Sequence, residues 1–380
     1  MRKPETIYLD YNATTPLDSE VIRAMRPYLE QHFGNPSSQH CFGLETKFAI
    51  EIARKQISTL LNCNPDEVVF TSGGTESNNY AIKGIAFEKH SQGNHIITSQ
   101  IEHPAVLEVC RFLETKGFEI TYLPVDHYGC INLSQLENAI RPTTILITIM
   151  HANNEVGTIQ PIREISKLAS EKGICFHTDA AQTVGKIETD VQHLGVDLLT
   201  IAGHKLYAPK GIGVLFIRNG VKLEKLMHGA NHENDLRAGT ENVLEIVGLG
   251  KAAEVAFRDM NENHEHLKLR RDELQRLLLK AIPDSVVNGH PEFRLPNTLS
   301  ISFPNIQANI LLGSIDKIAA SAGAACHTHS ISVSSVLEAM QIPVEIAMGT
   351  IRLSTGRETS LQDVRDAANM IISAVEIRRE

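Results

Sequence analysis

The feature that most constrains the fold is an alternation of short apolar runs and longer helical patterns between residues 65 and 220. The runs are rich in Val, Ile, Leu and Phe, and they read DEVVFTS, NHIITSQ, TTILITIMHA, ICFHTDA, DLLTIAGHK and GVLFIR. Strands that are apolar along nearly their whole length are typical of parallel sheets with helices on both faces. The sequence therefore predicts an α/β fold with a mostly parallel central sheet.

A second unit follows this sheet. Residues 244–282 contain no proline and become highly charged in the middle, which predicts a long helix that leaves one unit and lies along another. The runs NTLSISFP and GTIRLSTG then predict strands of a smaller α+β unit. Because 380 residues exceed one ordinary core, we expect a large domain over residues 15–258 and a small domain formed by residues 1–14 and 259–380.

The negative net charge of the chain limits the kinds of molecule that its surface can bind. A net charge of −9 and a pI near 6.0 argue against a surface built for nucleic acid, because phosphates are held by clustered lysine and arginine. No apolar run reaches the roughly 18 residues of a membrane-spanning helix, and the N-terminal segment lacks a signal-peptide pattern. We therefore expect a cytoplasmic protein without a membrane or direct nucleic-acid partner.

The six cysteines are scattered, without a C-x-x-C pair, so reduced thiols are expected. A zinc site at Cys326, His327 and His329 is the alternative. A structural zinc site needs four ligands, and nothing in the sequence completes this set. We therefore predict no metal.

Polar side chains follow two of the predicted strands. ICFHTDA carries Asp179 at its end, with Gln182 shortly after, while His204 and Lys205 close DLLTIAGHK. Desolvation at the mouth of an apolar sheet lowers the pKa of a lysine, as Schiff-base formation requires. A carboxylate such as Asp179 can hold a protonated pyridine nitrogen. These groups together suit a pyridine-containing aldehyde cofactor.

Other strand ends add further groups. The glycine-rich turn in VVFTSGGTES opens a helix at Gly74 and Thr75, whose backbone N–H groups can bind phosphate, and His103 and Asn154 follow two more strands. Each residue also has a plain structural explanation as a cap, a turn or a hydrogen-bonded core histidine. Ligands in open α/β sheets bind beyond the carboxyl ends of the strands, so the combined set predicts pyridoxal 5′-phosphate (PLP). A nicotinamide cofactor is set aside because G-x-G-x-x-G is absent.

The sequence resembles the cysteine desulfurases, which are class V members of the fold type I PLP enzymes, and their relatives the selenocysteine lyases. The resemblance covers nearly the whole chain and is carried by YLDYNATTPL, FGNPSSQH, FTSGGTESNN, EHPAV, HANNEVGTIQPI, HTDAAQTVGK, GHKLYAPKGIG, RAGTENV, GAAC and IRLSTGR. It implies an aminotransferase-like fold and an enzyme that converts L-cysteine into L-alanine.

The resemblance implies roles for the residues around the cofactor ring. Lys205 would bind PLP covalently, Asp179 would pair with the pyridine nitrogen and Gln182 would contact the phenolic oxygen. His103 would stack on the ring and assist proton transfer. Arg352 would clamp the substrate carboxylate, a bidentate task that suits a guanidinium group.

The resemblance also implies the phosphate site. Gly74, Thr75 and His204 would bind the phosphate, and Asn154 would lie near both cofactor and substrate. Thr240 in RAGT would reach the phosphate of a neighbouring subunit. The protein would therefore be a homodimer with shared active sites.

Cys326 lies in GAACHTHS, among small and hydroxyl residues. In the family, the matching cysteine attacks the substrate sulfur, takes it as a persulfide and leaves alanine. A thiol with a pKa of about 8.5 is only slightly ionised at neutral pH, so His327 and His329 would favour the reactive thiolate. The sulfur would then pass to an acceptor protein, and iron–sulfur assembly, RNA thiolation and DNA phosphorothioation all draw on such enzymes.

The sequence departs from the desulfurase pattern at two places, and these bear on which member of the family it resembles. Ala202 stands where many desulfurases carry a phosphate-binding serine, and HGANHENDLRAGT replaces the usual glycine-rich run before R-x-G-T. Ala202 and GAACH are also similar to selenocysteine lyases. Two alternatives therefore stay open, a selenocysteine lyase and a non-catalytic scaffold that keeps the aminotransferase fold.

Overall fold

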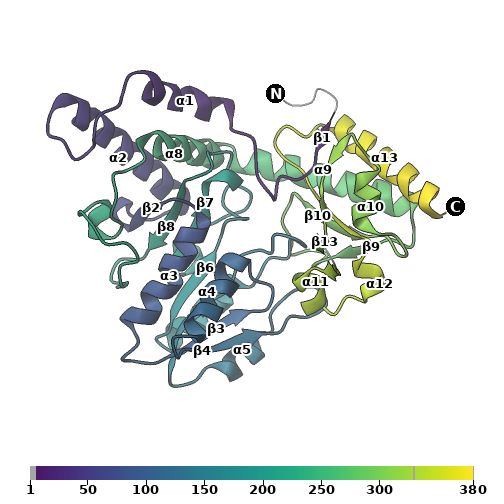
Figure 1. Ribbon diagram of the computed structural model, residues 1–380, viewed down its shortest axis with the longest axis horizontal. Helices are drawn as coiled ribbons and strands as arrows, with labels where there is room; N and C mark the ends of the chain where they lie inside the picture. The colour runs from purple at the N-terminus through teal and green to yellow at the C-terminus, as the bar shows by residue number, and fades with distance from the viewer. Residues whose placement is uncertain (1–5, 328–329, 380) are drawn as a thin grey trace.

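The computed structural model describes residues 6–327 and 330–379, with side chains throughout these ranges except at 324–332. Its largest element is a seven-stranded sheet in the order β2-β8-β7-β6-β5-β3-β4 (Figure 1). The strands are β2 (Val68–Thr71), β3 (His95–Ser99), β4 (Glu119–Leu123), β5 (Thr144–Thr148), β6 (Cys175–Asp179), β7 (Leu198–Ala202) and β8 (Gly213–Ile217). Only β8 runs antiparallel to its neighbours, so the predicted α/β fold with a mostly parallel sheet is confirmed.

Helices cover both faces of this sheet, because its strands are apolar on both sides. On one face, α3 (Gly74–Glu88) and α4 (Pro104–Glu114) pack over strand residues such as Ile96 and Leu198. The other face includes Ile97 and Leu199 and is covered by α1 (Ser19–Glu30), α2 (Cys41–Leu61), α5 (Leu133–Ala139), α6 (Ile162–Glu171), α7 (Val191–Leu194) and α8 (Val243–Arg258).

The C-terminal part of the chain forms a second sheet with its own apolar core. The four antiparallel strands lie in the order β12 (Ser321–Ala322), β15 (Thr350–Ser354), β10 (Thr298–Ser302) and β9 (Val286–Asn288). The helices α9 (Met260–Ala281), α10 (Ala308–Gly313) and α13 (Leu361–Arg379) contribute apolar side chains to this core.

The first described residues of the chain pack into this second core. β1 (Ile7–Tyr8) pairs in parallel with β11 (Ile318–Ala319), and Leu9 is fully buried in the second core. Figure 1 shows this N-terminal strand beside α9 and α13. The predicted domain boundaries at residues 15 and 258 stay a prediction.

The expectation of one long helix over residues 244–282 is wrong. The segment forms α8 and α9, which are separated by Asp259. Asp259 has φ −106° and ψ 14°, outside the helical values, and its carboxylate accepts a hydrogen bond of 2.7 Å from Arg258 Nε. Asp259 is thus both the last cap residue of α8 and the first cap residue of α9, and the bond to Arg258 holds its carboxylate at this break.

Short elements complete the fold. β13 (Ala324–His327) and β14 (Ser330–Val333) pair as antiparallel strands, and α11 (Ser335–Ala339) and α12 (Val344–Ala347) come after them. Three short 3₁₀ helices are η1 (Pro65–Glu67), η2 (Gly203–Lys205) and η3 (Glu233–Asp235). None of the helices in the described part of the chain is long and apolar enough to cross a membrane.

Candidate active site

A cavity of about 430 Å³ opens at the carboxyl ends of the parallel strands. Such ends meet at one edge of an open α/β sheet, which is where ligands bind. The cavity brings together most of the residues predicted from the sequence, namely Gly74, Thr75, His103, Asn154, Asp179, Gln182, His204, Lys205 and Arg352.

The start of α3 forms one wall of the cavity. Gly73 precedes the helix with φ +149°, and no described side chain caps the first turn. A Cβ atom at Gly74 would lie 3.1 Å from Cβ of Ala202, so glycine keeps this wall open. The backbone N–H groups of an uncapped first helical turn, together with the helix dipole, suit an anion.

Asp179 lies at the end of β6 and is 7% exposed. Its Oδ2 atom accepts a hydrogen bond of 2.6 Å from Asn78 Nδ2, and its Oδ1 atom accepts one of 2.9 Å from Ala181 N. These bonds hold the carboxylate at the cavity wall. Asn78 Oδ1 is buried without a described hydrogen-bond partner, which leaves an acceptor at the lining.

Lys205 follows β7 within η2. Its Nζ atom donates hydrogen bonds to Asn12 O at 2.5 Å and to Ala13 O at 2.7 Å. Burial lowers the pKa of Lys205 to about 8, and the positive charge of Arg352 acts in the same direction. A far larger fraction of the amine is therefore unprotonated near neutral pH than for an exposed lysine.

Two histidines, His103 and His204, line the cavity. His103 Nδ1 accepts a hydrogen bond of 3.1 Å from Ala105 N, which makes the ring the cap of α4 and leaves Nε2 as the position for a proton. Burial lowers the pKa of His103, and nearby Lys205 lowers it further while Asp179 opposes both. Burial likewise lowers the pKa of His204 to about 4, so both rings are neutral at pH 7.

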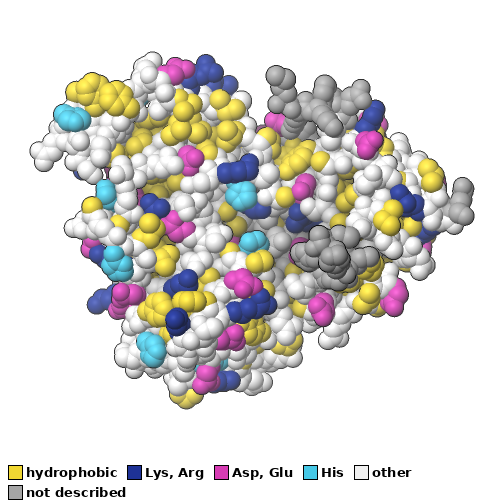
Figure 2. Space-filling view, viewed as in Figure 1, with side chains coloured by type: hydrophobic (Ala, Val, Ile, Leu, Met, Phe, Trp, Pro, Cys, Tyr) yellow, Lys and Arg dark blue, Asp and Glu magenta, His cyan; other side chains and the backbone are white. Residues whose placement is uncertain are grey.

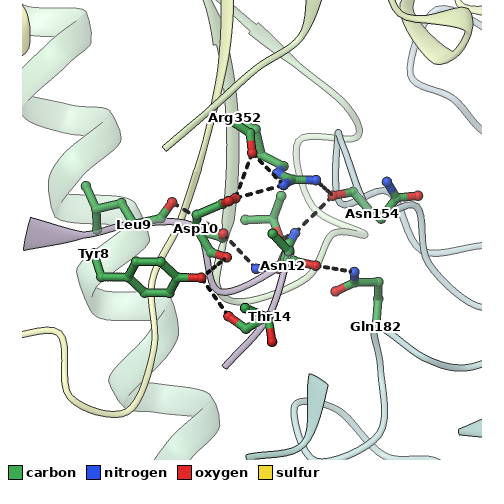
Figure 3. A network of polar contacts seen from close by, with 12 residues as sticks. Tyr8, Leu9, Asp10, Asn12, Thr14, Asn154, Gln182 and Arg352 are labelled. Carbon is green, nitrogen blue, oxygen red and sulfur yellow. Dashed lines mark hydrogen bonds and ion pairs between the residues drawn. The ribbon is translucent and has the colours of Figure 1, made fainter. Parts of the chain in front are cut away.

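Arg352 enters the cavity from β15 of the second sheet (Figure 3). Its Nη2 atom donates to Asp10 Oδ1 at 2.8 Å and to Ser321 Oγ at 2.9 Å, and its Nη1 atom donates to Asn154 O at 3.1 Å. Arg352 Nε is buried without a described partner. The contact with Asn154 goes to the backbone oxygen, and Figure 3 shows the Asn154 side chain directed elsewhere.

Asn12 joins the two sheets at the cavity (Figure 3). Its side-chain Nδ2 donates to Asn154 O at 3.1 Å and to Thr298 Oγ1 at 2.8 Å. Its backbone oxygen accepts from Gln182 Nε2 at 3.0 Å and from Lys205 Nζ. Asn12 is fully buried, so these bonds fix the N-terminal segment against groups from both units.

Two predicted site residues are not placed in this cavity. Thr240 is exposed and does not line it, so any role at a neighbouring subunit stays a prediction. Cys326 lies on β13 with its backbone opposite Ile331, and its side chain is outside the described residues. The alternative zinc ligands Cys326, His327 and His329 fall in the same region, and the described side chains hold no cluster of three or more potential ligands.

Sequence reasoning missed three residues of this site, Asp10, Asn12 and Asn78. The run YLDYNATTPL precedes the predicted sheet and gives no local sign that it returns to the strand ends. Asn78 lies one helical turn after Gly74, and this spacing is the one signal that could have found it.

A family model described as aminotransferase class-V matches residues 7–366 of the chain. The chain is 51% identical over 372 residues to a protein from Dictyoglomus turgidum named cysteine desulfurase IscS, covering 97% of this chain and 94% of the relative. A human protein named cysteine desulfurase is 43% identical over 377 residues, covering 98% of this chain and 82% of that one.

Solved structures agree with these relatives. A NifS-like protein superposes with a TM-score of 0.92 at 36% identity and covers 98% of this chain and 100% of its own. A structure described as SspA in complex with cysteine gives a TM-score of 0.81 at 38% identity, covering 93% and 100% of the two chains. The chain therefore belongs to the class-V aminotransferases and, within them, to the family of the cysteine desulfurases.

Proposed function

We propose that this protein is a PLP-dependent cysteine desulfurase that converts L-cysteine into L-alanine and passes the sulfur to Cys326 as a persulfide. The observation that carries the proposal is the meeting of a half-buried lysine, a buried carboxylate and an uncapped helix start in one cavity. The family membership of the chain supports the same activity.

The residues of the cavity fit PLP. The α3 start, with Gly74 and Thr75, suits the phosphate, and His204 adds a neutral N–H donor beside it. The Asp179 carboxylate suits a protonated pyridine nitrogen, and Lys205 supplies the amine for the aldehyde. The unpartnered Asn78 Oδ1 atom is a further sign that the lining is built for a polar ligand.

When bound, PLP supplies an electron-poor pyridinium ring that stabilises negative charge at the substrate α-carbon. The chain supplies the remaining parts. Lys205, with its lowered pKa, can accept and return the α-proton, and Arg352 offers its unpartnered Nε to the substrate carboxylate. His103, whose pKa is lowered by burial, is a second group able to move a proton at the cavity.

The sulfur step uses Cys326. A bond forms between the Cys326 sulfur and the substrate sulfur while the substrate carbon–sulfur bond breaks, so the products are L-alanine and a Cys326 persulfide. The Cys326 thiolate supplies the electron pair of the new sulfur–sulfur bond, and the electron pair of the broken carbon–sulfur bond stays with the substrate carbon, which takes up a proton. The sulfur is thereby oxidised and the carbon reduced within one step, so no outside oxidant or reductant is needed. Two hydrogen bonds hold the residues that flank the hairpin of β13 and β14. Ser334 N donates to Gly323 O at 3.0 Å, and Ser334 Oγ donates to Glu155 Oε2.

The test starts with the purified protein and PLP. We expect visible absorbance that Lys205→Ala abolishes, alanine formation from L-cysteine, and a sulfur adduct on Cys326 by mass spectrometry. Cys326→Ala should lose desulfuration, while Cys130→Ala should keep it, because burial raises the pKa of that thiol to about 11. A colourless wild-type protein would reject the proposal, and full activity of Cys326→Ala on cysteine and selenocysteine would reject the persulfide step.

We further propose that the protein is a homodimer. The aromatic and aliphatic side chains of Phe33, Phe42, Leu44 and Phe48 are 81%, 48%, 54% and 68% exposed. Figure 2 shows apolar side chains gathered over α1 and α2 at the upper left, and a contiguous apolar surface of this kind fits a second copy of the chain. Phe48→Glu should give monomers by sedimentation velocity, whereas Phe293→Glu, at an exposed site elsewhere, should not.

The sulfur acceptor and the cellular location of the enzyme are the last parts of its function. We propose that the enzyme works in the cytoplasm and delivers sulfur to an acceptor protein, because the Cys326 persulfide must lose its outer sulfur before the next turnover. Mass spectrometry of Cys326 before and after incubation with each candidate acceptor identifies the partner, because only the true acceptor should remove the sulfur rapidly. Cell fractionation tests the location.

A further inference from the structure

Lys186 is a buried lysine that the chemistry above does not use. It is 5% exposed, and its Nζ atom donates a hydrogen bond of 3.0 Å to Oε1 of Gln182. Among the described residues, no carboxylate forms an ion pair with Lys186, although buried lysines are usually paired. Among the described side chains, the Lys186 amine therefore has the Gln182 oxygen as its hydrogen-bond partner.

Burying an amine without a carboxylate is unfavourable. Burial lowers the pKa of Lys186 to about 7, and the positive charges of Lys205 and Arg352 act in the same direction. An apolar side chain of similar length would fill the same space without this penalty. The amine can donate to Gln182 in both protonation states, because a neutral amine still carries N–H groups.

The contact decides which end of the Gln182 amide faces the cavity. An amide has an oxygen end that accepts and a nitrogen end that donates. Lys186 occupies the oxygen end, and the nitrogen end donates at 3.0 Å to Asn12 O, which also accepts from Lys205. If the amide turned over, its oxygen would face the Asn12 oxygen and its nitrogen would face the Lys186 amine.

We propose that Lys186 is a positioning residue of the active site, which holds the Gln182 amide so that its nitrogen end stays turned toward Asn12 and the bound cofactor. The proposal rests on the proposed function, in which Gln182 contacts the phenolic oxygen of PLP. That oxygen carries negative charge, and an N–H donor stabilises it while a carbonyl oxygen would repel it. Lys186 thus acts on the cofactor through Gln182.

A double-mutant cycle tests this chain of contacts. Lys186→Met, Gln182→Ala and the double variant are titrated with PLP, with Lys172→Met as a control at an exposed lysine. Losing one hydrogen bond to a charged oxygen predicts about tenfold weaker PLP binding for each single variant. The double variant should bind no more weakly than Gln182→Ala, and Lys186→Arg, which keeps a donor, should bind within about threefold of wild type.

A spectroscopic readout separates positioning from a merely structural role. In Lys186→Met, the pH midpoint of the visible band of bound PLP should rise by about one unit, since a tenfold loss of anion stabilisation equals one pKa unit. The midpoint should not change in Lys172→Met. Independent, additive losses in the cycle, or an unchanged midpoint in Lys186→Met, would overturn the proposal.

A measurement on the cofactor-free wild-type protein needs neither PLP nor a folded Lys186 variant. In protein labelled with ¹⁵N-glutamine, the Gln182 side-chain signal is assigned by its loss in Gln182→Ala. Its amide protons should exchange with water at least about tenfold more slowly than those of Gln362, because the Gln182 amide is buried with both ends held, whereas Gln362 is exposed and donates to Asp366 at the surface. Exchange as fast as that of Gln362 would refute the positioning role, whereas a protein that binds no PLP would refute only the proposed function.

Discussion

Replacing Glu233 with glutamine should strongly destabilise the protein, because its carboxylate neutralises a buried arginine. Arg54 on α2 donates from Nη1 to Glu233 Oε2 at 2.9 Å and from Nη2 to Glu233 Oε1 at 2.8 Å. The two side chains are 7% and 3% exposed. Phe70 N also donates to Glu233 Oε2 at 2.8 Å, so one carboxylate satisfies groups of a helix and a strand.

The burial of the Arg54–Glu233 pair sets the size of the loss in stability. Removing one partner of a buried ion pair leaves an uncompensated charge, which costs about 3–5 kcal/mol. The pair also holds a backbone segment that is unfavourable by itself, since Glu233, Asn234 and Asp235 have φ values of 48°, 55° and 67°. Non-glycine residues in the left-handed region cost roughly 1 kcal/mol each, so the ion pair offsets a strained turn.

Equilibrium urea unfolding of Glu233→Gln and wild type measures this loss. Glu273→Gln is the matched control, because Glu273 pairs with Arg276 at the surface of α9 and such pairs contribute little. The double variant Arg54→Met/Glu233→Leu should recover much of the stability, although Phe70 N loses its acceptor. A loss below about 1 kcal/mol in Glu233→Gln would refute the reasoning.

Three other measurements test the surroundings of the site. Burial raises the pKa of Glu102 to about 8, so between pH 4.5 and 8 the folded protein holds a proton that the unfolded chain has released. Stability should therefore fall as pH rises through this window, by a few kcal/mol, and Glu102→Gln should flatten the dependence in thermal unfolding at each pH. Gly213→Ala would place a Cβ 2.7 Å from Gly73 Cα, so it should cost about 1–3 kcal/mol and weaken PLP binding in an absorbance titration. In the cofactor-free protein, reductive methylation of Lys205 followed by mass spectrometry should show a titration midpoint near 8, and a midpoint near 10.5 would contradict the lowered pKa.

The order of apolar strands and helical patterns was sufficient to predict the fold class, because a parallel sheet covered on both faces needs strands without an alternating polar side. The same rule led to Asp179 and Lys205, which lie at the ends of two apolar strands, since parallel strands end at one edge. The break at Asp259 was missed, because a charged helix surface looks the same on either side of a single non-helical residue.

The sequence by itself determined which chemical groups stand at the strand ends, because local patterns specify the strands, the helices and the residues that link them. Only the tertiary structure decided which distant segments complete the cavity. Asp10 and Asn12 meet Arg352, Gln182 and Lys205 there because β1 pairs with β11 at the other end of the chain. Pairing over such sequence distances depends on the packing of whole units, which no local run of residues encodes.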